Sequence, residues 1–293
     1  MHEIWYYNNG EYKQEKICAE KWMRLIYENP VGRATLPWLV KRKIFSRMYG
    51  MYCRTRLSAD KIKQFVDDNQ VDMTGCAETY DSFADFFIRE KTGISFPDIS
   101  GILGSPCEGL VSAASDIDPG QAVAAKGSIY TLAELFGDSD LAEMYNEGSM
   151  LQIRLTPANY HRMHFFDCGK ITGTKFLDGD LFSVSPLALK HVARLYCRNK
   201  RALIRFSSQN FGEVVIVEVG ATFVGSIVHL FGDGDNVSRG QQASYFLPGG
   251  SLVLLFFTKD TFVPNDTLLY QTNEGFETKI SVGEPLGQKP GAI

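Results

Sequence analysis

The spacing of apolar residues and the local composition change near Pro97, and this change constrains the fold of the chain most strongly. Before it, apolar residues recur at spacings of three and four over Glu15–Tyr27 and Leu39–Tyr52, which is the period of an amphipathic helix. After it, Gly, Pro and Asp become frequent, and short runs of β-branched and large apolar residues lie between turn residues. The sequence therefore predicts an α+β protein, with a helical N-terminal region followed by a mainly β domain that has a few helices.

The same patterns predict the individual elements and a domain boundary. We place a helical, basic region at 1–95 and the mainly β domain at 96–293. Further helices are expected over Ser58–Asp67, Ser82–Arg89, Thr131–Phe136 and Leu187–Cys197, and strands over Met150–Leu155, Val214–Val219, Ala221–Val228 and Leu252–Phe257. The longest apolar run is the last of these strands, far shorter than the roughly twenty residues of a membrane-spanning helix.

Composition excludes several protein classes. Of the 293 residues, 44% are hydrophobic and 22% charged, which is typical of a globular protein and not of a disordered or membrane-spanning chain. The N-terminal residues show no basic stretch followed by an apolar segment, so no secretory signal is expected. Six cysteines are scattered without a C-x-x-C pair, which favours free thiols in a reducing cytosol over a disulfide framework or a zinc site.

Positive charge is concentrated in one part of the N-terminal region. Between Arg33 and Lys63 there are nine Lys or Arg residues and a single acid, Asp60. Trp38 and Phe45 interleave with these cations at helical spacing, which favours a helix that docks on an anionic membrane surface. The alternative is a solvated basic face over an apolar stripe packed in the core. One basic stretch without a recognisable motif does not predict nucleic-acid binding.

Two of the five histidines are candidates for chemistry. His161 and His164 belong to the motif Tyr-His-Arg-Met-His, which follows an expected strand and Pro157, so we expect them on a loop or a single turn at a strand end. A histidine there can act as acid or base at neutral pH, although packing with satisfied ring nitrogens is the alternative. His191 and His229 are expected to be structural or surface residues.

The dipeptide Gly250-Ser251 is the second candidate site. Pro248 and Gly249 precede it, and taken alone the tetrapeptide predicts a turn. Because the serine follows two glycines at the mouth of a buried strand, it is also a candidate for self-cleavage of the chain.

Several segments, in order along the chain, resemble the phosphatidylserine decarboxylases. They are Ser105–Gly109, Thr156–His164, Gly179–Val184, Asn199–Arg201, Val219–Ile227 and Gly249–Ser251. The N-terminal segments WYYNNGEY, ENPVG and FSRMYGMYCR look like the bacterial type II branch of that family. No single motif is specific to this family. Taken together and in this order the motifs are specific, and they span nearly the whole chain.

The resemblance implies an enzyme that makes a pyruvoyl cofactor from its own backbone. The Oγ atom of Ser251 would attack the carbonyl of Gly250, and elimination and hydrolysis would then leave the pyruvoyl group at position 251. His164 would be the base for this self-cleavage, oriented by Glu108, where the family usually has Asp. The pyruvoyl carbonyl would form a Schiff base with the substrate amine, and His161 would handle the proton that replaces carbon dioxide.

The resemblance also implies partners and a location. Cleavage would give a β chain of residues 1–250 and an α chain of residues 251–293, with higher assembly left open. The substrate would be phosphatidylserine and the product phosphatidylethanolamine. The protein would lie at the cytoplasmic side of a bacterial cell membrane, bound peripherally to anionic lipid. No metal and no nucleic acid are implied.

Some positions depart from the family pattern. Glu108 adds a methylene, Asn159 stands where Asp often occurs, and Leu252 replaces a small Thr or Ser. Gln242 and Ser244 replace Glu and Gly. Two alternatives follow: a decarboxylase of a soluble amino acid or another aminoacyl substrate, and an uncleaved, lipid-binding relative.

Overall fold

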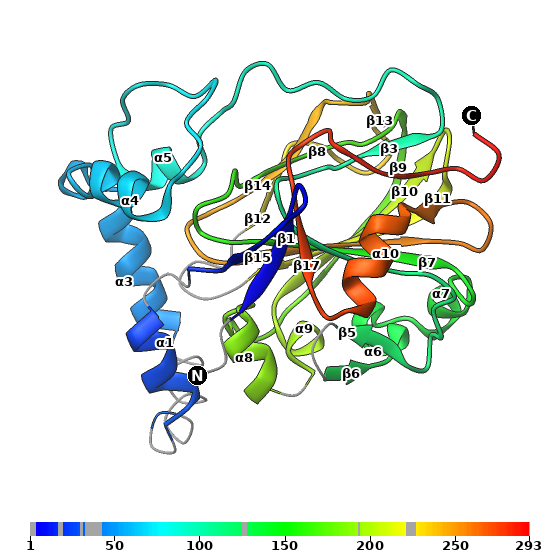
Figure 1. Ribbon diagram of the computed structural model, residues 1–293, viewed down its shortest axis with the longest axis horizontal. Coiled ribbons are helices and arrows are strands. Elements are labelled where there is room, and N and C mark those ends of the chain that lie inside the picture. The colour runs from blue at the N-terminus through cyan, green and yellow to red at the C-terminus, as the bar shows by residue number, and fades with distance from the viewer. Residues whose placement is uncertain are drawn as a thin grey trace.

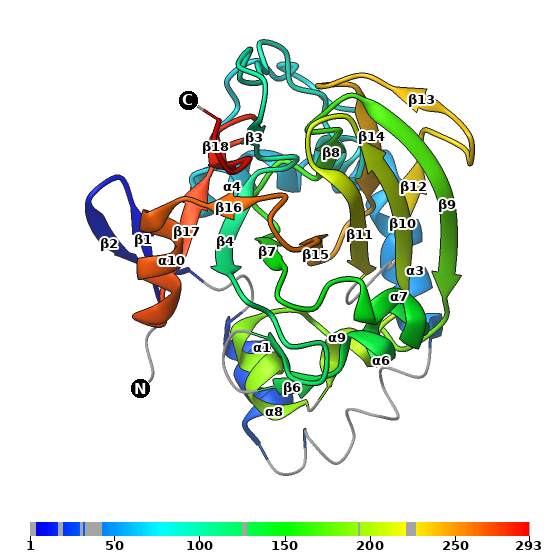
Figure 2. The same cartoon turned by 90° about the vertical axis from the view of Figure 1, so that its right-hand side faces the viewer.

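The computed structural model describes residues 4–16, 20–29, 32, 43–124, 128–192, 194–220 and 227–292. A ten-stranded sheet curves through the molecule (Figure 2), and all of its neighbouring strands are antiparallel except β17 and β1. In sheet order the strands are β13 (Asn236–Val237), β9 (Gly169–Leu177), β10 (Arg201–Ser208), β11 (Gly212–Gly220), β15 (Ser251–Phe257), β7 (Ser149–Leu155), β4 (Gly109–Ala114), β17 (Glu277–Ile280), β1 (Trp5–Asn8) and β2 (Glu11–Gln14).

Smaller sheets surround the large one. The first consists of β12 (Ile227–His229), β14 (Gln242–Phe246) and β8 (Arg162–His164), and the second of β16 (Val263–Pro264), β18 (Pro285–Gln288) and β3 (Ile102–Gly104). A two-stranded ribbon joins β5 (Ala122–Ala124) to β6 (Ser128–Tyr130).

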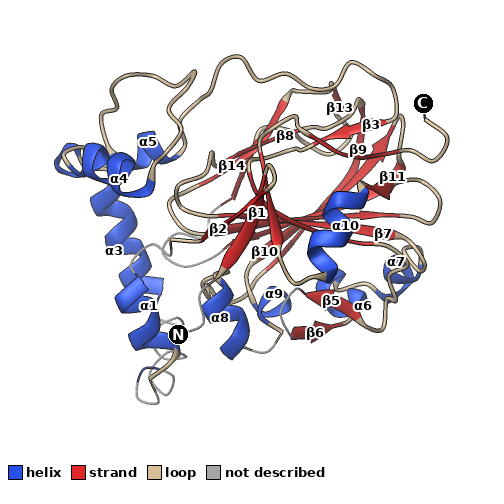
Figure 3. Cartoon of the chain, in the orientation of Figure 1, coloured by secondary structure: helices blue, strands red, loops and turns tan. Residues whose placement is uncertain are grey.

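The helices form two groups (Figures 1 and 3). At one end of the molecule lie α1 (Glu20–Tyr27), α3 (Lys43–Cys53), the short 3-10 turn η1 (Arg56–Ser58), α4 (Lys61–Asn69) and α5 (Phe83–Phe87). The others are α6 (Leu132–Phe136), α7 (Ser139–Glu143), α8 (Pro186–His191), α9 (Leu195–Arg198) and α10 (Asp266–Asn273). Every helix in the described ranges is too short or too polar to cross a lipid bilayer.

The central strand β15 is buried along its whole length because it contributes to a core on each face of the sheet. Leu252, Leu254 and Phe256 join the core that also contains residues of α6 to α9. Val253, Leu255 and Phe257 join the opposite core, which contains Met163 of β8 and Phe246 of β14. Side chains alternate along a strand, so Ser251 faces this second core.

The predicted α+β class is confirmed, and several elements lie where the sequence predicts them. Helices α5 and α6 start at N-caps Ser82 and Thr131, whose hydroxyl groups accept backbone N–H bonds. The expected helix over Leu187–Cys197 is two helices instead, separated at Arg194, which has a left-handed φ of 55°. Most of the strand expected over Ala221–Val228 lies outside the described residues.

The expectation of a helical first hundred residues is wrong at its beginning. Strands β1 and β2 form a hairpin that extends the edge of the large sheet beside β17. Arg154 of β7 holds the hairpin in place through Glu15, the residue that follows β2. Its two terminal nitrogens donate to the two carboxylate oxygens of Glu15, each at 2.8 Å. It also binds Glu277 at 3.0 and 2.6 Å, and the three side chains are at most 8% exposed. These contacts join residues far apart in the chain, which local periodicity does not reveal. The division at residue 95 stays a prediction.

Candidate active site

Ser251 lies in the middle of the large sheet, at the first residue of β15. It pairs with Leu155 of β7 on one side and with Gly220 of β11 on the other, and it is 2% exposed. The serine that sequence analysis singled out is therefore held by hydrogen-bonded strands on both sides, facing the second core.

The histidine motif runs beside the segment that leads into Ser251, and the loop or turn expected for it is wrong for His164, which ends strand β8. Strand β8 pairs with β14, with Arg162 opposite Tyr245, and the backbone N–H of Phe246 donates to the carbonyl of His161 at 3.0 Å. Because the chain continues from Phe246 to Gly250, this pairing places His161 next to the approach to the candidate cleavage site.

His161 is fully buried and has one unused ring nitrogen. Its Nδ1 lies 2.8 Å from the carbonyl oxygen of Asn159, so Nδ1 carries the hydrogen and Nε2 has the free lone pair. Within the described residues, Nε2 has no hydrogen-bond partner. Burial lowers the pKa of His161 to about 3, opposed by the backbones of Asn159 and Gly249. The ring is therefore neutral near pH 7, with an available lone pair, and Gly249 lies close enough to influence its charge.

His164 has a partner at each ring nitrogen. Nδ1 lies 2.9 Å from the carbonyl oxygen of Gly240 and Nε2 lies 3.1 Å from the hydroxyl of Tyr160. Burial raises the pKa of Tyr160 to about 12, so its hydroxyl keeps its proton and donates to Nε2. Burial also lowers the pKa of His164. The described contacts include no bond from His164 to Glu108 or to Ser251.

Glu108 binds Asn159 and not the expected histidine. Its Oε1 accepts a hydrogen bond from Asn159 Nδ2 at 2.7 Å, while Asn159 Oδ1 accepts from the backbone N–H and the hydroxyl of Thr156 at 2.7 and 2.8 Å. The carbonyl of Asn159 is the same group that binds His161. Glu108 and His161 thus contact the same residue, Asn159, and the contact between Glu108 and Asn159 joins two positions that depart from the family pattern.

The N-terminal helical region covers His161. The ring of Phe87 in α5 packs on the imidazole with 4.0 Å between ring centroids. Arg89, just after this helix, donates from Nη2 to the carbonyl oxygens of Ala158 and Asn159 at 3.0 and 3.1 Å. The end of α5 therefore holds the loop that carries the histidine motif.

A buried carboxylate that sequence analysis missed lies on the same face of the sheet as Ser251. Glu218 of β11 is fully buried, lies 2.6 Å from Nε2 of His229 and accepts a hydrogen bond from the hydroxyl of Ser244. Burial, followed by the charges of Glu218 and Glu108, raises the pKa of the Cys107 thiol well above its ordinary value. A glutamate inside the apolar run Val-Val-Ile-Val-Glu-Val was the sequence signal for this residue.

No group of three or more His, Cys, Asp or Glu side chains in the described ranges is arranged to hold a metal ion. The chemistry available at this site is that of a buried serine hydroxyl, a neutral imidazole and a carboxylate that is hydrogen-bonded to an amide.

Comparison with known proteins gives a consistent result. The family model for phosphatidylserine decarboxylase matches residues 81–288. A phosphatidylserine decarboxylase proenzyme from Clostridium perfringens (strain SM101 / Type A) is 40% identical and aligns over 99% of this chain and 100% of its own length. Proenzymes of the same name from Clostridium botulinum (strain Langeland / NCTC 10281 / Type F) and Ruminiclostridium cellulolyticum are 39% and 38% identical, each over 98% of this chain and 99% and 97% of their own lengths.

Proposed function

Because the chain belongs to the phosphatidylserine decarboxylase family, we propose that it converts phosphatidylserine to phosphatidylethanolamine and carbon dioxide after cleaving itself at Gly250-Ser251. One observation carries the proposal: Ser251 begins a central, buried strand, and His161, which lies beside the segment leading into that strand, has a buried Nε2 without a partner among the described residues. The relatives are named proenzymes, which supports cleavage of a precursor.

The proposed self-cleavage uses residues of this chain alone. A base takes the proton of the Ser251 hydroxyl, Oγ bonds to the carbonyl carbon of Gly250, and the peptide C–N bond breaks to leave an ester and a free amine. Loss of the Cα proton of residue 251 then expels the Gly250 carboxylate, and water replaces the amine, which leaves as ammonia. The small Gly250 leaves its carbonyl open to attack.

The contacts favour His161 as the base that takes the serine proton. The sequence predicts His164 for this role and Glu108 as its orienting carboxylate, but both ring nitrogens of His164 already have partners. Neutral His161 has its Nδ1–H fixed by Asn159, so Nε2 can accept a proton. We propose that Glu108 positions His161 through Asn159, and the role of His164 stays a prediction.

The site fits the pyruvoyl group that the family implies. Position 251 is buried, small residues precede it, and the nearby His161 has a buried Nε2 without a partner among the described residues. When present, that group supplies an electron sink for the loss of carbon dioxide. We propose that His161 holds the proton that replaces the carboxyl group, and that the cover formed by Phe87 excludes water from the site.

The two products of cleavage are expected to stay together. Strand β15 would begin the α chain, and it remains paired with β7 and β11 of the β chain over its whole length. Its apolar side chains fill both cores, so separation would expose a large buried surface.

We also propose that the end of the molecule formed by α3 and η1 docks on the cytoplasmic face of the cell membrane. Met48, Met51 and Leu57 are 62%, 68% and 75% exposed there. Arg54 and Arg56 lie among them in sequence, which suits anionic lipid headgroups. Trp38 of the predicted docking helix lies outside the described residues.

A paired measurement tests this function. The purified protein is expected to contain two chains, the smaller beginning after Gly250, and to release carbon dioxide from phosphatidylserine in vesicles. The Ser251→Ala variant should remain one chain without activity. Cleaved protein that forms no phosphatidylethanolamine would contradict the proposed reaction, and release from free serine would favour a soluble substrate instead.

A further inference from the structure

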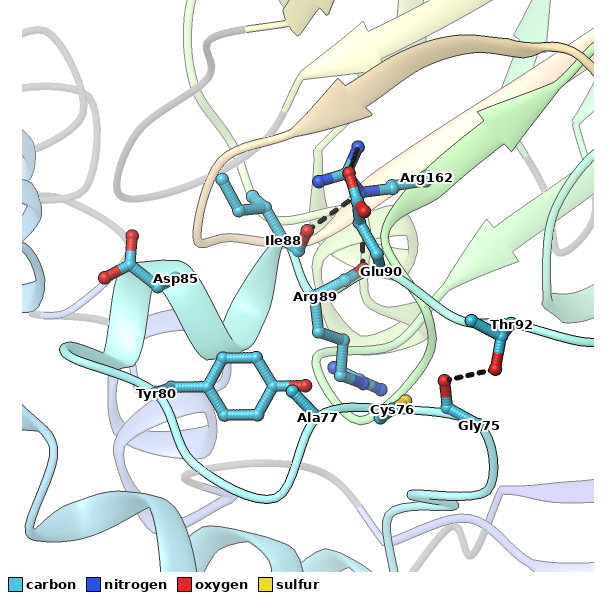
Figure 4. Close-up of a pocket in the computed structure, with 10 residues that line it drawn as sticks. All are labelled: Gly75, Cys76, Ala77, Tyr80, Asp85, Ile88, Arg89, Glu90, Thr92 and Arg162. Atoms are coloured by element: carbon cyan, nitrogen blue, oxygen red, sulfur yellow. Dashed lines mark hydrogen bonds and ion pairs between the residues drawn. The ribbon is translucent and has the colours of Figure 1, made fainter.

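A cavity of about 670 Å³ lies between the segment from Gly75 to Thr92 and Arg162 of β8, the central residue of the histidine motif (Figure 4). Its charged lining residues are Arg89, Arg162, Asp85 and Glu90. Arg162 directly follows His161 in the chain, so the cavity adjoins the candidate active site without being part of it.

Arg162 presents an incompletely used guanidinium group to this cavity. Its Nε donates to the carbonyl of Ile88 at 2.8 Å, and its Nη1 donates to Gln242 Oε1 at 2.7 Å. Nη2 donates to no residue that the structure describes. Its carboxylate partner is Glu90, 3.3 Å from Nη1 with a side chain that is 71% exposed. Arg162 is only 10% exposed, but Glu90 is well solvated when it leaves the pair, so another anion can replace it at little cost.

A second cation lies deeper in the cavity wall. Arg89 is 3% exposed, and its terminal nitrogens donate to backbone carbonyl groups. Among the described residues it has no carboxylate within ion-pair distance, and its Nε and the hydroxyl of Tyr80 are both buried without a hydrogen-bond partner. Figure 4 shows Tyr80 pointing toward the Arg89 side chain. Of the two acids, Asp85 already accepts a hydrogen bond from Ser82 at 2.8 Å.

We propose that this cavity binds a phosphate group, namely the phosphodiester of the lipid substrate. An arginine fork matches two phosphate oxygens, so the phosphate would take Nη2 of Arg162 and displace Glu90 from Nη1. Buried Arg89 adds a positive charge that the described residues leave unneutralised. The neutral amide of Gln242 completes the site, because it accepts from Arg162 without cancelling its charge. The assignment of the lipid as ligand rests on the proposed function.

Two substitutions that change charge in opposite senses test the phosphate site. Glu90→Gln removes the competing carboxylate, and Gln242→Glu places a carboxylate permanently on Arg162. On phosphatidylserine in neutral mixed micelles we expect KM to fall about two- to fivefold in the first and to rise by a similar factor in the second. The kcat value should change less than about twofold in both. Glu78→Gln, an exposed acid of the same segment outside the cavity, is the matched control.

Binding to the uncleaved Ser251→Ala protein provides a readout that needs no catalysis. Calorimetry with sn-glycero-3-phosphoethanolamine should give tighter binding with Glu90→Gln added and weaker binding with Gln242→Glu added. KM values and affinities that match the Glu78→Gln control would overturn the site, even if the wild-type enzyme is active. Inactive wild-type protein that still shows the affinity changes would instead remove the proposed function and keep the phosphate site. If inorganic phosphate binds and sn-glycero-3-phosphoethanolamine does not, the assignment to the lipid headgroup is overturned.

Discussion

Replacement of His161 by Gln is the most direct test of how the chain activates Ser251. A positioned general base contributes about 10² to 10⁴ in rate, so we expect self-cleavage to slow by at least about a hundredfold. Replacement of His164 by Gln removes contacts with Gly240 and Tyr160 and should slow cleavage less. Cell-free translation, with the uncleaved chain followed on a gel, gives both rates.

The pH dependence of the wild-type cleavage rate tests whether the base is a buried histidine with a lowered pKa or a histidine with an ordinary pKa. A histidine with a pKa of about 6.5 is only about 3% neutral at about pH 5, so its rate would fall roughly 30-fold from the value at about pH 7.5. Burial lowers the pKa of His161 to about 3, so it stays neutral over this whole interval. We expect the rate to change by less than about threefold.

The lowered pKa of His161 also makes the unfolding free energy of the uncleaved Ser251→Ala protein depend on pH. Because the pKa of His161 is lower in the folded than in the unfolded chain, the unfolded state binds more protons below about pH 6.5. Stability is therefore lost as the pH falls, by about 2 kcal/mol at about pH 5 for this group. Adding His161→Gln should remove that part of the slope, as urea unfolding at each pH will measure.

Three results would refute the reasoning. They are a cleavage rate that falls near pH 6.5, a variant at position 161 that cleaves normally, or a pH slope of stability that the Gln substitution leaves unchanged. Loss of cleavage only on replacement of His164 would restore the assignment made from the sequence.

Other substitutions test the supporting structure. Asn159→Ala removes the link between Glu108 and the histidine loop and should slow cleavage by up to about a hundredfold, measured by the same gel assay. Arg154→Met leaves two buried carboxylates unpaired and should cost about 3 to 5 kcal/mol of unfolding free energy, whereas Lys259→Met, which breaks an exposed pair, should leave it nearly unchanged. Leu57→Glu should weaken sedimentation with anionic vesicles while the chain still cleaves, and unchanged sedimentation would exclude this docking surface.

Local features of the sequence were sufficient for the fold class and for many elements. The continuous apolar run after Ser251 predicts a buried strand over Leu252–Phe257, and β15 is buried along its whole length. The sequence predicts a helix over Thr131–Phe136, and α6 begins at N-cap Thr131 with a full capping box. Such signals depend only on neighbours within a few residues, so they can be recognised without knowledge of the tertiary structure.

The partners of each candidate site residue could not be predicted in the same way. The family resemblance implied that His164 and Glu108 form a pair, but the pairing of β8 with β14 and the turn at Asn159 set the direction of each side chain. A shift of one residue in strand register turns a side chain to the opposite face. Which histidine lies near Gly249 is therefore a property of register between distant segments.

The sequence by itself determined that this chain has an α+β fold with a serine at the mouth of a buried strand and two histidines at the end of another. Those are consequences of local period and turn chemistry. Only the tertiary structure decided that Nε2 of His161 is buried without a partner among the described residues, that Glu108 and His161 both bind Asn159, and that Arg162 lines a cavity. Burial and long-range hydrogen bonds set those environments, and both arise only when distant segments pack together.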